Sequence, residues 1–291
     1  MSWSALPAHG LRIVGLLVAF WLAASWTAER QTFHPRHWND GPAPAARGWA
    51  YRDVSFRDSP GLVLRGWWIP GTRHRTVVMV HGWTSSRQEP MSRAGYLHDA
   101  GYNLLVFDLR GHGASDGGYT TLGGAEPDDV RAAVHFAHRQ DPGPVALLGY
   151  SMGASAAVEA AAGGADVRAV VEDSGFASLL DVVRASFTRV TRLPADPFAD
   201  PMLALSAADL GVDLARIRPV DAAAHLTRPL LAILGTADTL VPPAQGYALF
   251  EATRGPRELL VVPGAGHVGA YARAPARYRQ AVLDFLATYL D

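Results

Sequence analysis

The sequence predicts an α/β fold with a mostly parallel, eight-stranded sheet and helices on both faces. From Trp49 onward, short apolar runs alternate with helix-forming stretches, as in strand–helix–strand units. The first two strand-like runs have no helix between them and should pair as a hairpin. The strand-like runs are Tyr51–Phe56, Leu62–Ile69, Thr76–His81, Asn103–Phe107, Val145–Leu148, Val167–Glu172, Pro229–Leu234 and Leu259–Val262; helix-like stretches lie near 86–100, 126–140, 152–162, 243–253 and 275–290.

Composition narrows the chemistry available to the chain. With 291 residues, 49% of them hydrophobic and 18% charged, the chain can bury a large core. A net charge of -1 gives no electrostatic reason to expect nucleic acid as a partner. The chain has neither lysine nor cysteine, which excludes Schiff-base, P-loop, Ser-Lys and thiol chemistry. Catalysis would therefore rest on Ser, His, Asp, Glu and Tyr.

The N-terminal residues 1–30 contain an apolar run, Leu11–Ala28, which predicts a membrane anchor or a signal segment. Tryptophans near its end suit a membrane interface, whereas Ala23–Ser25 offers a small-residue cleavage site. A helix packed on the soluble domain is the third interpretation. Arginines on both sides of the run leave its orientation open.

Residues 31–48 predict a linker, because they are rich in proline and glycine, and residues 49–291 predict the folded domain. Such a spacer should let the N-terminal segment and the domain fold independently. Within the domain, about fifty residues from Phe176 to Leu226 interrupt the strand–helix rhythm with helical patches and prolines. We expect this 176–226 segment to form a small helical cap.

The stretch "LLGYSMGASAA", residues 147–157, places a serine between two glycines where a strand gives way to a helix. This is the context of the G-x-S-x-G elbow, in which a strained turn exposes the hydroxyl of a nucleophilic serine. Side chains at Gly149 or Gly153 would collide with neighbouring backbone. The pattern predicts that Ser151 is a nucleophile rather than an ordinary helix cap.

A serine nucleophile needs a base and an acid that orients it, and both should follow strands of a parallel sheet. Asp238 follows the strand "PLLAIL", and His267 lies in the glycine-rich loop after "LLVV". His267 would act as general base and Asp238 would orient it.

Backbone N–H groups should form the oxyanion hole, because they need no reorganisation as charge develops. One would belong to Met152, directly after the serine. The other would belong to Trp83, in the turn that Gly82 permits after the strand "TVVMV". His81, at the start of that turn, is expected to be structural.

The segments "VVMVHGWTSSR", "LVFDLRGHGASDG", "LLGYSMGASAA", "LLAILGTADTLVPP" and "VVPGAGHVGAY" resemble those of serine hydrolases with the α/β-hydrolase fold. The chain looks most similar to their small membrane-anchored Bem46/ABHD-like group. This resemblance implies the triad Ser151, Asp238 and His267, an oxyanion hole from Trp83 and Met152, and neither a metal nor an organic cofactor. It also implies that the loop Asp108–Gly117 braces the oxyanion loop. In some relatives an acid at the end of the strand after the elbow helix, here Glu172–Asp173, replaces the acid at the position of Asp238, so Asp173 is an alternative acid.

We therefore expect acyl transfer from a small-molecule ester or related acyl substrate to water. A serine peptidase or amidase using the same triad is the main alternative, and a non-catalytic scaffold is a third. The intact serine, aspartate and histidine argue against the scaffold. His135 and His138 share a helix face without a carboxylate partner motif and should be surface residues.

Overall fold

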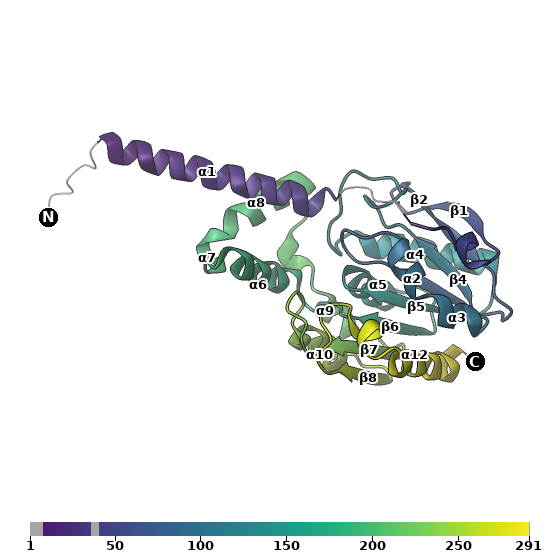
Figure 1. The fold of residues 1–291 in the computed structure, drawn as a ribbon. Helices are drawn as coiled ribbons and strands as arrows, with labels where there is room; N and C mark the ends of the chain where they lie inside the picture. Colours follow the sequence, from purple (N-terminus) through teal and green to yellow (C-terminus); the bar gives the residue numbers. More distant parts are fainter. Residues whose placement is uncertain (1–7, 36–40, 291) are drawn as a thin grey trace.

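The computed structural model describes residues 8–35 and 41–290 (Figure 1). Parts of the predicted anchor (residues 1–7) and of the predicted linker (residues 36–40) lie outside the described residues. The N-terminal helix projects from one side of an α/β domain, as Figure 1 shows.

The domain is built on a single eight-stranded sheet with the strand order β1-β2-β4-β3-β5-β6-β7-β8. β1 and β2 form the expected antiparallel hairpin, β2 is also antiparallel to β4, and every other pair is parallel. This confirms the predicted sheet. The strands are β1 (Arg52–Arg57), β2 (Val63–Ile69), β3 (Thr76–Val80), β4 (Asn103–Phe107), β5 (Val145–Tyr150), β6 (Ala169–Asp173), β7 (Leu230–Gly235) and β8 (Arg257–Val262).

Helices cover both faces of the sheet. Alternate strand residues point to opposite faces, and apolar side chains on each face are buried under helices. Val78 belongs to one hydrophobic cluster, with α4 (Glu126–Gln140), α5 (Met152–Ala162) and α10 (Pro243–Ala252). Its neighbours Val77 and Met79 belong to the other. That second cluster includes residues of α2 (Gln88–Arg93), α3 (Gly95–Asp99), α11 (Ala270–Arg273) and α12 (Pro275–Leu290).

The 176–226 segment joins β6 to β7 and is largely helical. α6, α7 and α8 lie to one side of the sheet (Figure 1), and α8 packs against the N-terminal helix. The last helix of the segment, α9, packs against α5 and α10. Its elements are α6 (Leu179–Thr191), α7 (Ala195–Phe198), α8 (Asp200–Leu210), the 3-10 helix η2 (Leu214–Arg216) and α9 (Pro219–Ala223).

The N-terminal helix α1 (Ala8–Phe33) continues past the predicted boundary at residue 30. Every residue from Arg12 to Phe20 is exposed, whereas Ser25, Glu29 and Phe33 are buried at 6%, 1% and 1% exposure. These three recur every fourth position and so share one helix face. The helix ends at Phe33 because Pro35 disfavours helical geometry at His34. The Phe33 side chain lies in the hydrophobic core of the domain.

The end of α1 packs against α8. His34 Nε2 lies 3.2 Å from Asp209 Oδ2, at the end of α8. In the predicted linker, residues 44–47 form the 3-10 helix η1 (Pro44–Arg47). Among the described residues, one helix is long and apolar enough to cross a membrane, Arg12–Phe33, with a mean hydropathy of 1.3.

Candidate active site

Ser151 lies at the sharp turn between β5 and α5. Its backbone has φ 51° and ψ -118°, a conformation that is unusual for a residue with a side chain. A Cβ atom on Gly149 would lie 2.4 Å from the carbonyl oxygen of Gly153, and one on Gly153 would lie 2.4 Å from that of His81. Only glycine fits on either side of this serine, as the sequence pattern indicated.

Ser151, His267 and Asp238 form a continuous hydrogen-bonded chain. Ser151 Oγ lies 2.8 Å from His267 Nε2, and His267 Nδ1 lies 2.7 Å from Asp238 Oδ2. Because a carboxylate only accepts, Nδ1 carries a proton toward Asp238, which leaves the Nε2 lone pair facing the serine hydroxyl. In this tautomer His267 can accept the proton of Ser151.

Backbone amides fix the carboxylate of Asp238. Its Oδ1 accepts the N–H groups of Leu240 and Val241, both at 2.9 Å, while Oδ2 faces the imidazole. Asp238 is 6% exposed, so water competes little for these bonds. The turn after β7 therefore holds a carboxylate in one orientation toward His267.

Gly82 and Trp83 follow β3 and lie next to the serine. A Cβ atom on Gly82 would be 3.3 Å from the Ser151 Cβ. The Gly82 N–H donates to Glu89 Oε2 at 2.8 Å, which ties this loop to α2. Met152 is the first residue of α5, where a backbone N–H has no partner within the helix. An anion beside Ser151 would therefore meet the N-terminal end of a helix.

The end of α1 bonds directly to Trp83 and is linked to Met152 through Thr120. The indole Nε1 of Trp83 donates to the carbonyl oxygen of Thr32 at 2.8 Å. The Phe33 carbonyl accepts the Thr120 N–H at 2.8 Å, and Thr120 Oγ1 lies 3.6 Å from Met152 Sδ. The first residues of the predicted 31–48 linker therefore belong to α1, and Thr32 and the buried Phe33 join that helix to the domain.

His81 is structural, as expected. Its Nδ1 donates to the Gly82 carbonyl oxygen at 2.7 Å, and its Nε2 accepts the Leu109 N–H at 3.0 Å. Complete burial lowers the pKa of His81 to about 4, so the ring is neutral at physiological pH. This imidazole joins the loop after β3 to the loop after β4.

The loop Asp108–Gly117 is held by buried polar contacts. The carboxylate of Asp108 accepts the N–H groups of Arg87 at 2.7 Å and Ala114 at 2.9 Å. Arg110 forms an ion pair with Asp129 through its Nε and Nη2 atoms. Each of these side chains has a protein partner, in keeping with the expected bracing role.

Asp173, the alternative acid, has its carboxylate held by two hydroxyl groups. Its carboxylate accepts the Tyr278 hydroxyl and the Ser174 hydroxyl, both at 3.0 Å. Burial raises the pKa of Asp173 to about 6. Ser174 Oγ in turn accepts the Val268 N–H at 3.1 Å, directly after His267. The structure therefore brings Asp238, not Asp173, to the histidine.

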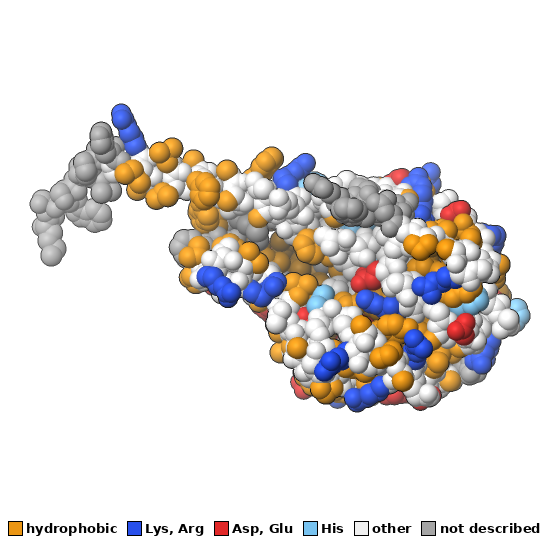
Figure 2. Space-filling view, viewed as in Figure 1, with side chains coloured by type: hydrophobic (Ala, Val, Ile, Leu, Met, Phe, Trp, Pro, Cys, Tyr) orange, Lys and Arg blue, Asp and Glu red, His pale blue; other side chains and the backbone are white. Residues whose placement is uncertain are grey.

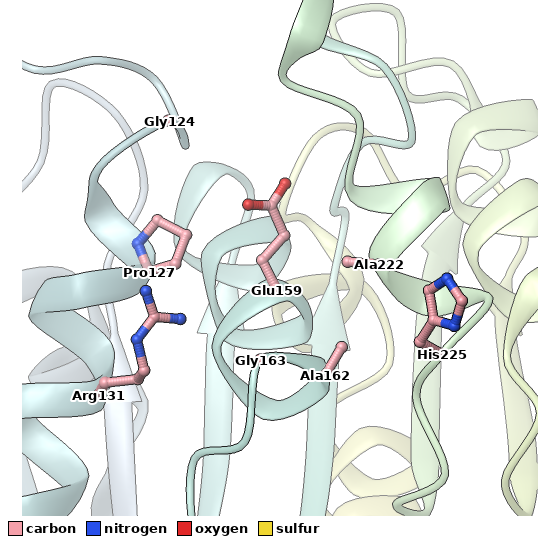
Figure 3. A pocket seen from close by; sticks show the side chains of 8 residues that line it. All are labelled: Gly124, Pro127, Arg131, Glu159, Ala162, Gly163, Ala222 and His225. Carbon is pink, nitrogen blue, oxygen red and sulfur yellow. The ribbon is translucent and has the colours of Figure 1, made fainter.

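A separate hollow of about 360 Å³ lies at the far end of α5 from Ser151 (Figure 3). Arg131, Glu159 and His225 surround it, from α4, α5 and the residues after α9. Burial raises the pKa of Glu159 to about 7. This hollow holds none of the predicted site residues. His138, which was predicted to lie at the surface, is half-buried, and its Nε2–H donates to the carbonyl oxygen of Asp166 at 2.8 Å.

Residues 77–281 match the model of the alpha/beta hydrolase family, and this range includes the elbow, Asp238 and His267. The chain belongs to the alpha/beta hydrolase family. The uncharacterized protein Rv2307c of Mycobacterium tuberculosis is 31% identical over 265 residues, covering 88% of this chain and 86% of that protein. The uncharacterized protein YfhR of Escherichia coli K12 is 26% identical over 263 residues, covering 86% and 84%.

Among solved structures, the chain is similar to that of the Pyrococcus furiosus esterase Pf2001. It superposes with a TM-score of 0.76 at 27% identity, covering 89% of this chain and 99% of that one. The chain is thus an alpha/beta hydrolase with esterases among its structural neighbours.

Proposed function

We propose that this alpha/beta hydrolase cleaves carboxylic esters or related acyl compounds through an acyl-enzyme on Ser151. The observation that carries the proposal is the contact of His267 with Ser151 Oγ at 2.8 Å and with Asp238 at 2.7 Å. Its similarity to an esterase of known structure supports the same reaction class. Membership of the Bem46/ABHD-like group stays a prediction.

In the first half of the reaction, Ser151 Oγ attacks the acyl carbon while His267 Nε2 takes the hydroxyl proton. Asp238 stabilises the imidazolium that forms. The N–H groups of Trp83 and Met152 would donate to the oxyanion. When the tetrahedral intermediate collapses, His267 returns the proton to the leaving alcohol, and the acyl group stays on Ser151. In the second half, water attacks the acyl carbon while His267 takes its proton. Collapse of the second tetrahedral intermediate returns the proton to Ser151 and releases the acid.

The surroundings favour an apolar acyl group. Val182, Val183 and Leu203 of the 176–226 segment pack against the same hydrophobic cluster that contains Met152. Figure 2 shows a recess with hydrophobic side chains between this segment and the body of the domain. An acyl chain in such a recess would gain roughly 0.8 kcal/mol per buried CH₂ group.

We also propose that α1 anchors the protein in a membrane, since its residues from Arg12 to Phe20 are exposed and almost all apolar. The full chain should then stay in the membrane pellet after a high-salt wash and dissolve only in detergent. Soluble protein whose N-terminus lies near Trp26 would instead identify a cleaved signal peptide.

The reaction is tested with p-nitrophenyl esters of graded chain length beside aminoacyl p-nitroanilides. We expect ester hydrolysis that Ser151→Ala abolishes. Circular dichroism should be unchanged, because the variant removes only one half-buried hydroxyl group. Faster cleavage of the anilides would favour the peptidase or amidase. Equal ester turnover by wild type and Ser151→Ala would refute the proposed nucleophile.

A further inference from the structure

The two halves of α1 have different surroundings. Every residue from Arg12 to Phe20 is exposed, and burial on one face begins at Trp21 and continues through Ser25 and Glu29 to Phe33. The buried face lies against α8. Only the first half of the apolar run is therefore free of the rest of the protein.

That free half is too short to cross a bilayer. At about 1.5 Å per residue, the apolar stretch from Ile13 to Phe20 covers roughly 12 Å, whereas the hydrocarbon core is about 30 Å thick. A spanning α1 must also use the part from Trp21 to Ala28. Because α8 packs along this second part, burying it brings the 176–226 segment to the membrane.

We propose that the end of α6 and the turn after it, residues Thr188–Pro194, form a second membrane contact seated among phospholipid headgroups beside α1. This inference rests on the proposed anchor but not on the proposed hydrolysis. Every residue of this patch is exposed. Val190 is 74% exposed and Leu193 is 45% exposed, values that stand out for large aliphatic side chains in a domain with a well-filled core.

The charges of the patch suit a phospholipid surface. Arg189 and Arg192 flank Val190, and their long side chains can extend to lipid phosphates while the aliphatic groups insert. The nearby Asp196 forms an ion pair with Arg184 at 2.9 Å. Its negative charge is therefore balanced and repels lipid phosphates little. Figure 2 shows basic and hydrophobic side chains together on this part of the molecule.

The chain contains no cysteine, so single cysteines can be labelled without altering other positions. The test uses the full-length Val190→Cys variant carrying a bimane label, reconstituted in phosphatidylcholine vesicles with and without brominated acyl chains. Leu17→Cys, which is 63% exposed on the free half of α1, reports the anchor. Ala287→Cys, exposed on α12 near the C-terminus and far from α6 in Figure 1, is the control outside the membrane.

Brominated lipid should quench the label at residues 17 and 190 and leave the label at residue 287 unchanged. If the label at residue 17 is quenched but the label at residue 190 is quenched no more than the label at residue 287, the second contact is overturned and the anchor is kept. Absence of quenching at both 17 and 190 would overturn both. Ester hydrolysis, measured on the same samples, reports the proposed reaction separately.

Discussion

The indole Nε1 of Trp83 donates a 2.8 Å hydrogen bond to the carbonyl oxygen of Thr32, joining the loop after β3 to the last turn of α1. The next residue, Phe33, is 1% exposed and lies in the core of the domain. The helix that would reach the membrane therefore also supports a candidate oxyanion-hole residue.

This contact predicts how N-terminal truncation will act. A protein that begins at His34 lacks Thr32 and Phe33, and so loses a buried phenyl ring, worth about 2–3 kcal/mol, and two hydrogen bonds of about 1 kcal/mol each. We expect its Tm to fall by about 10 °C and its kcat on a water-soluble ester to fall. A protein that begins at Trp21 keeps these contacts and is the control. Equal Tm and kcat in the two truncated proteins would show that the end of α1 is dispensable.

The acid of the proposed triad can be tested with two asparagine variants. Asp238→Asn should lower kcat by roughly 10⁴-fold, because an amide can hold His267 in the wrong tautomer, as in the well-studied serine protease triad. Asp173→Asn alters hydrogen bonds to Tyr278 and Ser174. It leaves intact the contact between Asp238 and His267. Its kcat should fall far less. Comparable losses in the two folded variants would mean that Asp238 does not have the assigned role.

The elbow predicts a sharp difference between two glycine substitutions. In Gly153→Ala the new Cβ would lie 2.4 Å from the His81 carbonyl oxygen and 2.6 Å from that of Val80. Overpacking against backbone should cost about 1–3 kcal/mol or more and displace Ser151, so ester hydrolysis should drop at least tenfold. Gly118→Ala, where nothing lies within 4 Å of the new atom, should keep full activity. A fully active Gly153→Ala enzyme would contradict this geometry.

Glu172 predicts a pH-dependent stability. Burial raises the pKa of this carboxyl from its ordinary value of 4.5 to about 8. Between these pH values the folded protein holds a proton on Glu172 that the unfolded chain has released. The contribution of Glu172 to the free energy of unfolding is therefore fully present below pH 4.5 and is lost as the pH rises through 8. Glu172→Gln keeps a carbonyl acceptor for the Gly175 N–H and has no proton to lose.

The measurement for Glu172 is the urea-unfolding free energy of both proteins at pH 5 and pH 8. The wild type should lose more stability over this interval than Glu172→Gln does. If both proteins change by the same amount, the carboxyl is ionised in the folded protein and the pKa assignment is wrong.

Local signals explain what could be predicted from the sequence. A short apolar run followed by glycine or a polar turn marks the end of a parallel strand, and Ser151, Asp238 and His267 each follow such a run. The sheet topology confines those strand ends to one edge of the sheet. The two elbow glycines were predictable because their need is purely local and steric.

Contacts between distant segments left no such signal. Thr32 and Trp83 are 51 residues apart, and nothing in the spacing of either indicates that an indole will meet a helix carbonyl. The proline- and glycine-rich stretch at residues 34–48 predicts a linker, but its composition gives no information about whether Phe33 enters the core. The link from Ser174 to Val268 likewise depends on how β6 and the loop after β8 pack together.

The central claim is that Ser151 is the nucleophile that carries the acyl group. The most direct measurement is the site of covalent labelling by a fluorophosphonate, mapped by peptide mass spectrometry on the full-length enzyme and on Ser151→Ala. We predict one adduct, on Ser151, that forms at a rate lowered strongly by Asp238→Asn and is absent from Ser151→Ala. An adduct on another serine, or equal labelling of Ser151→Ala, would contradict it.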